Sequence, residues 1–311
     1  MDSSELYHIK QQFFLGAFKS LVNLTLPDPN SPPYIPTLLY QARAHIALND
    51  TKAALQLLPS DSENIAVKAA ASLARYISVT QDTDQEAIDA SLEEIRDLAV
   101  EIEGDDVDAS EEDISTVRVL LGTAFARAGE VEEALETLGI DTEDLEGVCV
   151  IVQIYLSINR PDLARKQFER SKRWAEDDLL LQLIESTIGL VTGKDGYSNT
   201  NSFYTEQLGN PSLTSPHILT ARGVTRILRN EIPEAKSDLE ESLEQQKTDA
   251  ETAAALVVAA GLGGLKKSEA EELWTRFVSE HPDHPMVSDV LEKESLFDES
   301  ASKFPVPPAA A

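Results

Sequence analysis

The residues best suited to metal binding are two histidines and an aspartate near the end of the chain. His281, Asp283 and His284 lie together in the segment His-Pro-Asp-His-Pro. Imidazole and carboxylate groups are common zinc ligands, and a structural zinc site closes a tetrahedral set of them. Pro282 and Pro285 indicate a turn, however, and no further ligand lies nearby in the sequence. We therefore expect a turn between helices here, and no metal site.

Two other segments contain residue types that bind ions or phosphate in other proteins. The acidic segment 103–113 is rich in carboxylates, but its residue order does not match a calcium-binding helix–loop–helix loop. Residues 261–268 combine glycines with lysines and a serine, but the Lys-Ser pair does not follow a glycine at the spacing of a phosphate-binding loop. We expect a solvated acidic loop at the first place and a hairpin turn at the second.

The single cysteine gives no indication of catalysis. Cys149 lies among Val148, Val150, Ile151 and Val152, which is typical of a small buried hydrophobic side chain. A nucleophilic thiol would need a histidine partner and positive surroundings. One cysteine forms no intrachain disulfide and indicates a reducing compartment. Because no Ser-His-Asp or Cys-His arrangement is evident either, we predict no enzyme activity, no cofactor, and no catalytic or metal-binding residue.

The net charge of −29, from 26 basic and 55 acidic residues, limits the partners that the chain can bind. Such a surface repels nucleic acid and anionic lipid. The longest apolar stretch, 253–265, has 13 residues and is too short to span a bilayer. Two interpretations of the acidity stay open, namely solubility of a helical surface and a basic partner.

One short segment is basic, in contrast to the rest of the chain. Its cations are Arg165, Lys166, Arg170, Lys172 and Arg173, with Trp174 directly after them. They lie near the expected C-terminus of a helix, where positive charge is favourable. A solvated helix end and a docking surface for an acidic partner are both consistent with this cluster.

The elements that carry these residues are indicated by small residues that recur at helix-hairpin distance. From Ala134 to Ala164 is 30 residues and from Ala235 to Ala270 is 35. A period near 34 is typical of tetratricopeptide (TPR) repeats, which are stacked antiparallel helix hairpins. The marking residues include Ala42, Asn49 and Ala54; Gly122, Gly129 and Ala134; Tyr155, Asn159 and Ala164; Gly223, Asn230 and Ala235; and Ala270, Trp274 and Pro282.

This spacing predicts an all-α fold, a TPR-like α-solenoid of roughly seven to eight repeats. We expect one solenoid over residues 1–297, interrupted by a proline-rich loop at 27–36 and the acidic loop at 103–113, and then a flexible tail at 298–311. In each marked hairpin the small residues should meet where the two helices cross. The expected pairs are Ala42 with Ala54, Gly122 with Ala134, and Gly223 with Ala235.

Several segments also have the residues and order of a known family. They are 13–18, 152–166 with its Leu-Ala-Arg-Lys end, 188–193, the helix from Phe203, and 292–298 after His284-Pro285. Together they resemble the epsilon subunit of coatomer over nearly the full length. The resemblance implies a structural subunit of the coatomer vesicle coat, without cofactor or catalysis. It also implies binding to the C-terminal region of the alpha subunit of coatomer, no direct membrane insertion, a cytoplasmic location on Golgi membranes and COPI-coated vesicles, and a role in Golgi-to-ER and intra-Golgi transport.

The family does not locate the interface, so we predict it from repeat geometry. In a TPR stack the first helix of each hairpin lines the concave face, which usually binds the partner. Positions just after each small anchor point inward. The predicted partner-binding residues are Arg43, Ile46, Thr123, Arg127, Gln153, Leu156, Val224 and Ile227. Some of them are expected only to pack against neighbouring repeats.

Two alternative functions stay open at this point. A TPR adaptor for the acidic C-terminus of a chaperone needs a clamp of Lys and Asn on successive first helices. The matching positions hold Leu39 and Arg43, then Val119 and Thr123, so the clamp is missing. A scaffold of another large assembly, such as a cell-cycle or proteasome complex, is opposed only by the family resemblance.

Overall fold

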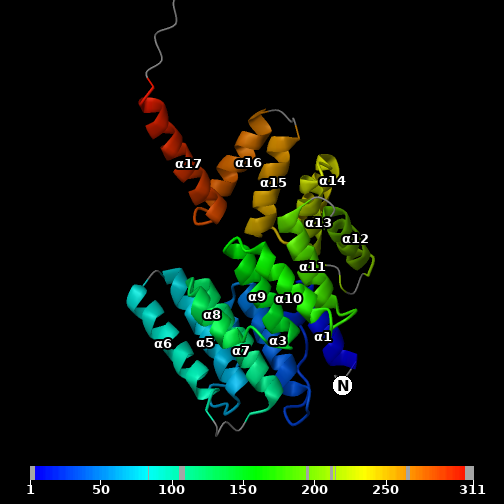
Figure 1. Cartoon of the computed structure of the whole chain (residues 1–311), viewed down its shortest axis with the longest axis vertical. Coiled ribbons are helices and arrows are strands. Elements are labelled where there is room, and N and C mark those ends of the chain that lie inside the picture. The colour runs from blue at the N-terminus through cyan, green and yellow to red at the C-terminus, as the bar shows by residue number, and fades with distance from the viewer. Residues whose placement is uncertain are drawn as a thin grey trace, which may run out of the picture. The chain divides into compact units, whose positions relative to one another are not determined.

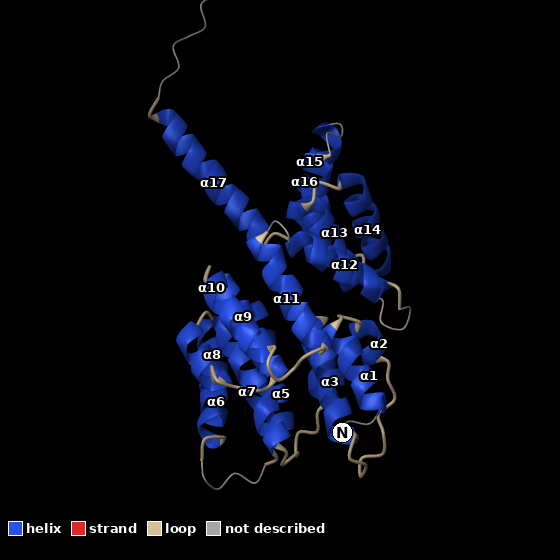
Figure 2. Cartoon of the chain, turned by 45° about the vertical axis from the view of Figure 1, so that its right-hand side comes forward, coloured by secondary structure: helices blue, strands red, loops and turns tan. Residues whose placement is uncertain are grey.

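The computed structural model describes residues 4–82, 84–104, 109–193, 196–210, 213, 215–263 and 267–304, and these residues form helices and no strand. Figure 2 shows the helical character of the chain, which confirms the all-α, TPR-like class. The helices are α1 (Ser4–Phe14), α2 (Phe18–Val22), α3 (Tyr34–Ala47), α4 (Thr51–Leu57), α5 (Ile65–Asp82), α6 (Gln85–Glu101), α7 (Glu111–Ala128), α8 (Val131–Leu138), α9 (Leu145–Ser157), α10 (Pro161–Ser171), α11 (Leu179–Thr192), α12 (Gly196–Leu208), α13 (Pro216–Leu228), α14 (Ile232–Gln245), α15 (Ala250–Leu262), α16 (Lys267–Glu280) and α17 (Pro285–Ser302).

Successive helices pack as antiparallel hairpins, as Figure 1 shows for α15 with α16. Each odd-numbered helix up to α15 contacts the even-numbered helix that follows it. Eight hairpins result among the described residues, in agreement with the predicted seven to eight repeats. The helix α17 follows them, and only Val287 of its side chains is buried.

The chain divides into two compact units, Met1–Ser215 and Pro216–Ala311. In the first unit the first helices of the hairpins, α3, α5, α7, α9 and α11, contact one another in succession, and their side chains form most of one large apolar core. The second unit has its own cores, around Leu239 and around Phe277. The expectation of a single solenoid over 1–297 stays a prediction.

The turn inside a hairpin is the same at four of the predicted marker positions. Asn49, Gly129, Asn159 and Asn230 all have left-handed backbone, with φ between 57° and 81°. The N–H of each next residue bonds a carbonyl five residues earlier, for example Arg160 to Tyr155 at 2.7 Å. This is the Schellman ending of a helix, which requires a residue that tolerates positive φ. Glycine and asparagine do so at the lowest energy, which explains their place in the pattern.

In two hairpins the closest neighbour of the first helix's glycine is a leucine and not the predicted alanine. A Cβ built on Gly122 would lie 2.5 Å from Leu138 Cγ, and one on Gly223 would lie 2.8 Å from Leu239 Cγ. Each leucine follows the predicted alanine by one helical turn. Both alanines are fully buried, so the second helix presents an alanine–leucine pair to the glycine.

Several predicted boundaries differ from the structure. The helix α3 begins at Tyr34, inside the predicted proline-rich loop 27–36, because Pro36 lies in the first turn, where backbone N–H groups need no helical partner. The helix α7 begins at Glu111, inside the predicted acidic loop, and residues 105–108 of that loop lie outside the described residues. The helix α17 runs to Ser302, beyond the predicted start of the tail, and residues 305–311 lie outside the described residues.

Candidate partner-binding surface

Two of the eight predicted interface residues are exposed. Arg127 lies in the last turn of α7, and Gln153 lies in the middle of α9. The helices α7 and α9 contact each other in the layer of first helices. Neither side chain forms an ion pair or hydrogen bond within the described part of the chain, so both are available to a partner.

Four predicted residues are apolar and half-buried. Ile46 on α3 and Leu156 on α9 pack against the large core of the first unit. Val224 and Ile227 on α13 pack against the core around Leu239 in the second unit. Each contributes to internal packing and keeps part of its surface exposed. Thr123 on α7 is half-buried too, and its hydroxyl donates to the Val119 carbonyl of its own helix at 2.6 Å.

Arg43, the eighth predicted residue, lies in an internal polar junction between α3 and α9. Its Nη2 donates to Glu146 Oε2 at 2.5 Å, and the Tyr40 hydroxyl donates to the other carboxylate oxygen. The guanidinium carbon lies 4.5 Å from the centre of the Phe13 ring. The junction therefore connects α1 and α3 to α9. The hairpin of α9 is the third one after the hairpin of α3. The position of Glu146, 103 residues away in sequence, gives no sign of this pairing.

The charges in this junction stabilise each other. Burial alone would raise the pKa of Glu146, but the Arg43 charge and the hydrogen bonds from Arg43 and Tyr40 hold that pKa below its usual value of 4.5. Burial and the carboxylate raise the pKa of Tyr40, so the hydroxyl stays a donor. Burial would lower the pKa of Arg43, but Glu146 keeps it above its usual value. Glu146 is therefore ionised and Arg43 protonated near neutral pH.

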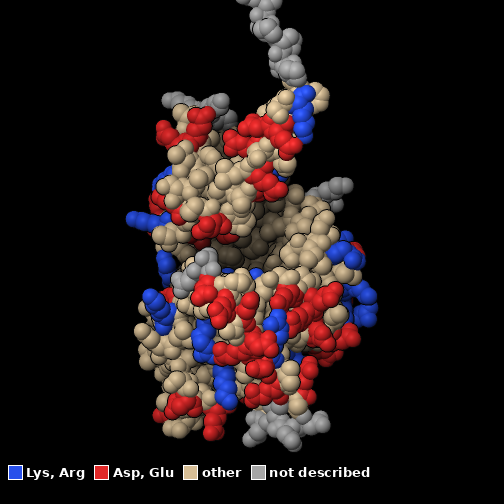
Figure 3. Space-filling view, turned by 90° about the vertical axis from the view of Figure 1, so that its left-hand side faces the viewer, with Lys and Arg blue, Asp and Glu red and all other residues tan. Residues whose placement is uncertain are grey.

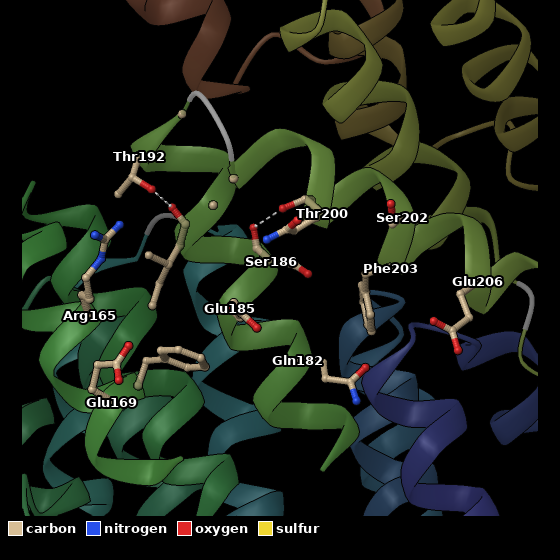
Figure 4. A pocket seen from close by; sticks show the side chains of 16 residues that line it. Arg165, Glu169, Gln182, Glu185, Ser186, Thr192, Thr200, Ser202, Phe203 and Glu206 are labelled. Atoms are coloured by element: carbon tan, nitrogen blue, oxygen red, sulfur yellow. Dashed lines mark hydrogen bonds between the residues drawn. The ribbon is translucent and has the colours of Figure 1, made fainter. Parts of the chain in front are cut away.

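The structure also contains a groove that the sequence reasoning missed. It lies in the first unit between α10, α11 and α12 and has a volume of about 760 Å³. Figure 4 shows Arg165 and Glu169 from α10 on one side and Phe203 and Glu206 from α12 on the other, with α11 between them. A Cβ on Gly196 would lie 3.0 Å from Gly189 Cα, so α11 and α12 cross at a glycine pair. These two glycines were the available sequence signal for this close crossing.

The side chains considered for chemistry serve structural roles. His284 accepts a hydrogen bond at Nδ1 from the Met286 N–H and so caps α17. His281 lies against Phe277, with ring centres 5.5 Å apart. Burial raises the pKa of the Cys149 thiol to about 12, so the thiol is protonated at neutral pH. The described residues contain no group of three or more His, Cys, Asp or Glu arranged for a metal ion.

Comparison with known proteins identifies the family. The family described as coatomer epsilon subunit matches residues 2–305. The chain belongs to the coatomer epsilon subunit family. The probable coatomer subunit epsilon of Schizosaccharomyces pombe is 24% identical over 97% of this chain and 93% of its own length. Coatomer subunit epsilon-1 of Arabidopsis thaliana is 27% identical over 96% of this chain and 97% of its own length.

The family membership confirms the resemblance inferred from the sequence motifs. The fold agrees as well, since a tetratricopeptide repeat protein from Parabacteroides merdae superposes with a TM-score of 0.54 at 14% identity, covering 82% of this chain and 96% of its own. That likeness concerns the fold alone. This member of the epsilon family has no helix, among its described residues, that is long and apolar enough to cross a membrane.

Acidic and basic side chains are interspersed on one face of the first unit. Figure 3 shows acidic side chains spread over the face of the first unit that carries α6 and α8, with basic side chains among them. Many arginines there are paired, as Arg96 is with Glu130 at 2.7 Å and Glu133 at 3.0 Å. The surface is therefore polar, with local charge pairs.

Proposed function

We propose that the chain is a non-enzymatic structural subunit of the coatomer vesicle coat. The observation that carries the proposal is the family match, which spans residues 2–305. Relatives named as epsilon subunits of coatomer occur in fungi, plants and animals. Stacked helix hairpins are also typical of proteins that bind other polypeptides along a long surface.

The proposed direct partner is the C-terminal region of the alpha subunit of coatomer, which the family resemblance implies. We place the contact on the layer of first helices, centred on Arg127 and Gln153, because these predicted side chains are exposed and form no ion pair or hydrogen bond with another described residue. The half-buried Leu156 lies one turn from Gln153 on α9 and adds an apolar contact. Through this partner the chain would act in the cytoplasm on Golgi membranes and COPI-coated vesicles, in Golgi-to-ER and intra-Golgi transport.

Co-purification tests this interface. We expect the double variant Arg127→Glu and Gln153→Glu to lose the alpha subunit from affinity purifications, while its thermal unfolding matches wild type because both side chains are exposed. The matched control is Lys52→Glu with Gln85→Glu, which makes the same charge change at exposed positions on the second helices α4 and α6. The control should retain the alpha subunit. Equal recovery of the alpha subunit with both variants would reject the proposed face.

The chaperone-adaptor alternative receives no support from the side chains at the clamp positions. Such an adaptor would present cations to a carboxylate. Arg43 is instead paired with Glu146, and the Thr123 hydroxyl bonds its own helix. A scaffold role in a different assembly is distinguished by the same purification, since it predicts equimolar recovery of proteins other than coatomer subunits.

A further inference from the structure

Four cations without an ion pair to any described residue gather on the helix α10 and directly after it. Arg165, Lys166, Lys172 and Arg173 lie on or directly after α10, and all four are exposed. None forms an ion pair within the described residues. Elsewhere arginines are usually paired with carboxylates. The paired ones include Arg43, Arg75, Arg96, Arg160, Arg222, Arg226, Arg229 and Arg276.

An apolar depression lies beside these cations, between α9, α10 and the turn after α8. Its volume is about 350 Å³. Its apolar lining comes from Ile140, Tyr155 and Leu163, and Ile140 is 50% exposed. Lys166 and Arg173 lie at the same depression. A surface of this size accommodates one bulky side chain more readily than a whole helix.

Hydrogen bonds fix the turn that carries Ile140. The Ile140 carbonyl accepts from Gln167 Nε2 at 2.7 Å and from Arg170 Nη1 at 3.1 Å. Arg170 also donates to the Asp141 carbonyl at 2.7 Å and pairs with the Asp141 carboxylate. The backbone is thus held against α10 while the Ile140 side chain stays half exposed. The depression is a preformed part of the fold.

The balance of charge around the depression is positive. Asp141 and Glu169 are the carboxylates that line it, and Arg170 pairs with Asp141. Lys166, Arg170 and Arg173 line it as well, so its cations outnumber its carboxylates by three to two. The whole chain has a net charge of −29, so this local excess of positive charge contrasts with the rest of the chain. Local positive charge favours a negatively charged ligand.

We propose that this surface, defined by Lys166, Arg173, Ile140, Tyr155 and Leu163, binds an acidic peptide segment that carries one bulky apolar residue. The apolar residue would fill the depression, and flanking carboxylates would contact the two cations. A membrane fits less well, because the remaining surface repels anionic lipid. The proposal goes beyond coat assembly and does not use Arg127 or Gln153.

Fluorescence anisotropy of a labelled peptide tests the proposal on the full chain. The probe is Glu-Asp-Glu-Phe-Asp-Glu-Glu, compared with the same peptide carrying alanine in place of phenylalanine. We expect the phenylalanine peptide to bind at least about five-fold more tightly, because only it fills the depression. The variant Ile140→Ala should reduce this preference and leave binding of the alanine peptide unchanged.

A charge-reversed variant with a matched control separates the site from general electrostatics. Lys166→Glu with Arg173→Glu should weaken binding by about ten-fold or more. The control, Lys52→Glu with Arg118→Glu, changes the total charge equally at exposed cations on α4 and α7, and it should stay within about two-fold of wild type. All four positions are exposed, so thermal unfolding should not change.

Several outcomes would overturn the proposal. They are no binding by wild type, equal loss in both charge variants, no preference for phenylalanine, and binding to phosphatidylserine vesicles that depends on Lys166 and Arg173 while the peptide does not bind. Self-association through this face, seen by sedimentation and lost in the same variant, would also overturn it. Recovery of the alpha subunit with the Lys166 and Arg173 variant tests the coat function separately.

Discussion

Single residues with left-handed backbone end the first helix in four hairpins, and their side chains make different contributions to stability. Asn159 has φ of 57°. We predict that Asn159→Gly is neutral or stabilising by a few tenths of a kcal/mol, whereas Asn159→Val destabilises by about 1–2 kcal/mol, because a β-branched residue is strained at positive φ. Chemical denaturation of both variants checks this. A valine variant as stable as wild type would show that this turn is not a Schellman ending in solution.

The junction of Arg43, Tyr40 and Glu146 should make stability depend on pH. The pKa of Glu146 is lower in the folded chain than its usual 4.5, so the carboxylate stabilises the fold above that value and loses this effect as pH falls through the lowered native pKa. We predict that Glu146→Gln costs about 3 kcal/mol at pH 7, because it leaves the largely buried Arg43 charge unpaired. The difference from wild type should shrink below pH 4.5. Urea unfolding over a range of pH measures it.

Two further variants control this prediction. Glu136→Gln removes an exposed carboxylate on α8 and should change the free energy of unfolding by less than about 0.5 kcal/mol. Arg43→Met combined with Glu146→Leu should recover much of the loss, because an apolar pair replaces the buried ion pair without leaving a lone charge. A constant difference between Glu146→Gln and wild type across the pH range would contradict the assignment.

The residue scale shows where sequence reasoning succeeds and where it fails. Asn159 was identified because its role depends on the local backbone, which the neighbouring residues determine. Arg43 was assigned to the partner surface by its position after a small anchor. Its actual neighbour, Glu146, comes from a helix three hairpins later, and no local pattern in the sequence indicates that pairing.

At the scale of the helices, two hairpins contain a close contact between a glycine and a leucine, namely Gly122 with Leu138 and Gly223 with Leu239. Gly122→Ala would place its Cβ against Leu138, so we predict destabilisation by about 1–2 kcal/mol despite the better helix propensity of alanine. In a Leu138→Ala background the same change should instead stabilise by up to about 1 kcal/mol, because the clash is gone and the propensity remains. A double-mutant cycle from thermal or urea unfolding measures this reversal of sign. Additive effects in the cycle would contradict the contact.

The helix hairpins could be predicted from the spacing of small residues, but the contacts and exposure of individual side chains on the helices could not. The period near 34 residues, with small residues at the crossings, was enough to predict the hairpins. The spacing predicts the fully buried Ala134 as the residue of α8 nearest Gly122, whereas Leu138 lies nearest. Repeat spacing gives the register of the two helices, but it does not say how far each side chain reaches. In α17, Leu291 is 53% and Phe297 71% exposed, although an apolar residue would be expected to pack. The groove between α10, α11 and α12 was missed for the same reason, since it depends on how neighbouring hairpins stack.

At the scale of the whole chain, two compact units have separate apolar cores, and this leads to a prediction about fragments. The large core around Phe125 and Ile151 is formed by residues before Ser215, and the cores around Leu239 and Phe277 are formed by residues after Pro216. We predict that residues 1–215 fold alone, with helical circular dichroism and a cooperative thermal transition, because in a repeat protein each hairpin is stabilised by its neighbours. The first unit ends in a hydrogen bond from Ser215 to Leu15, so the fragment should include Ser215.

A second cut serves as the control for this experiment. A fragment that ends after α8 lacks Glu146 and therefore leaves Arg43 without its partner, as well as exposing the core face of α7 to water. We expect it to unfold at a lower temperature than residues 1–215, with a broader transition. If residues 1–215 were instead unfolded alone while the full chain melted in one transition, folding would require both units. The boundary at Ser215 would then have no thermodynamic meaning.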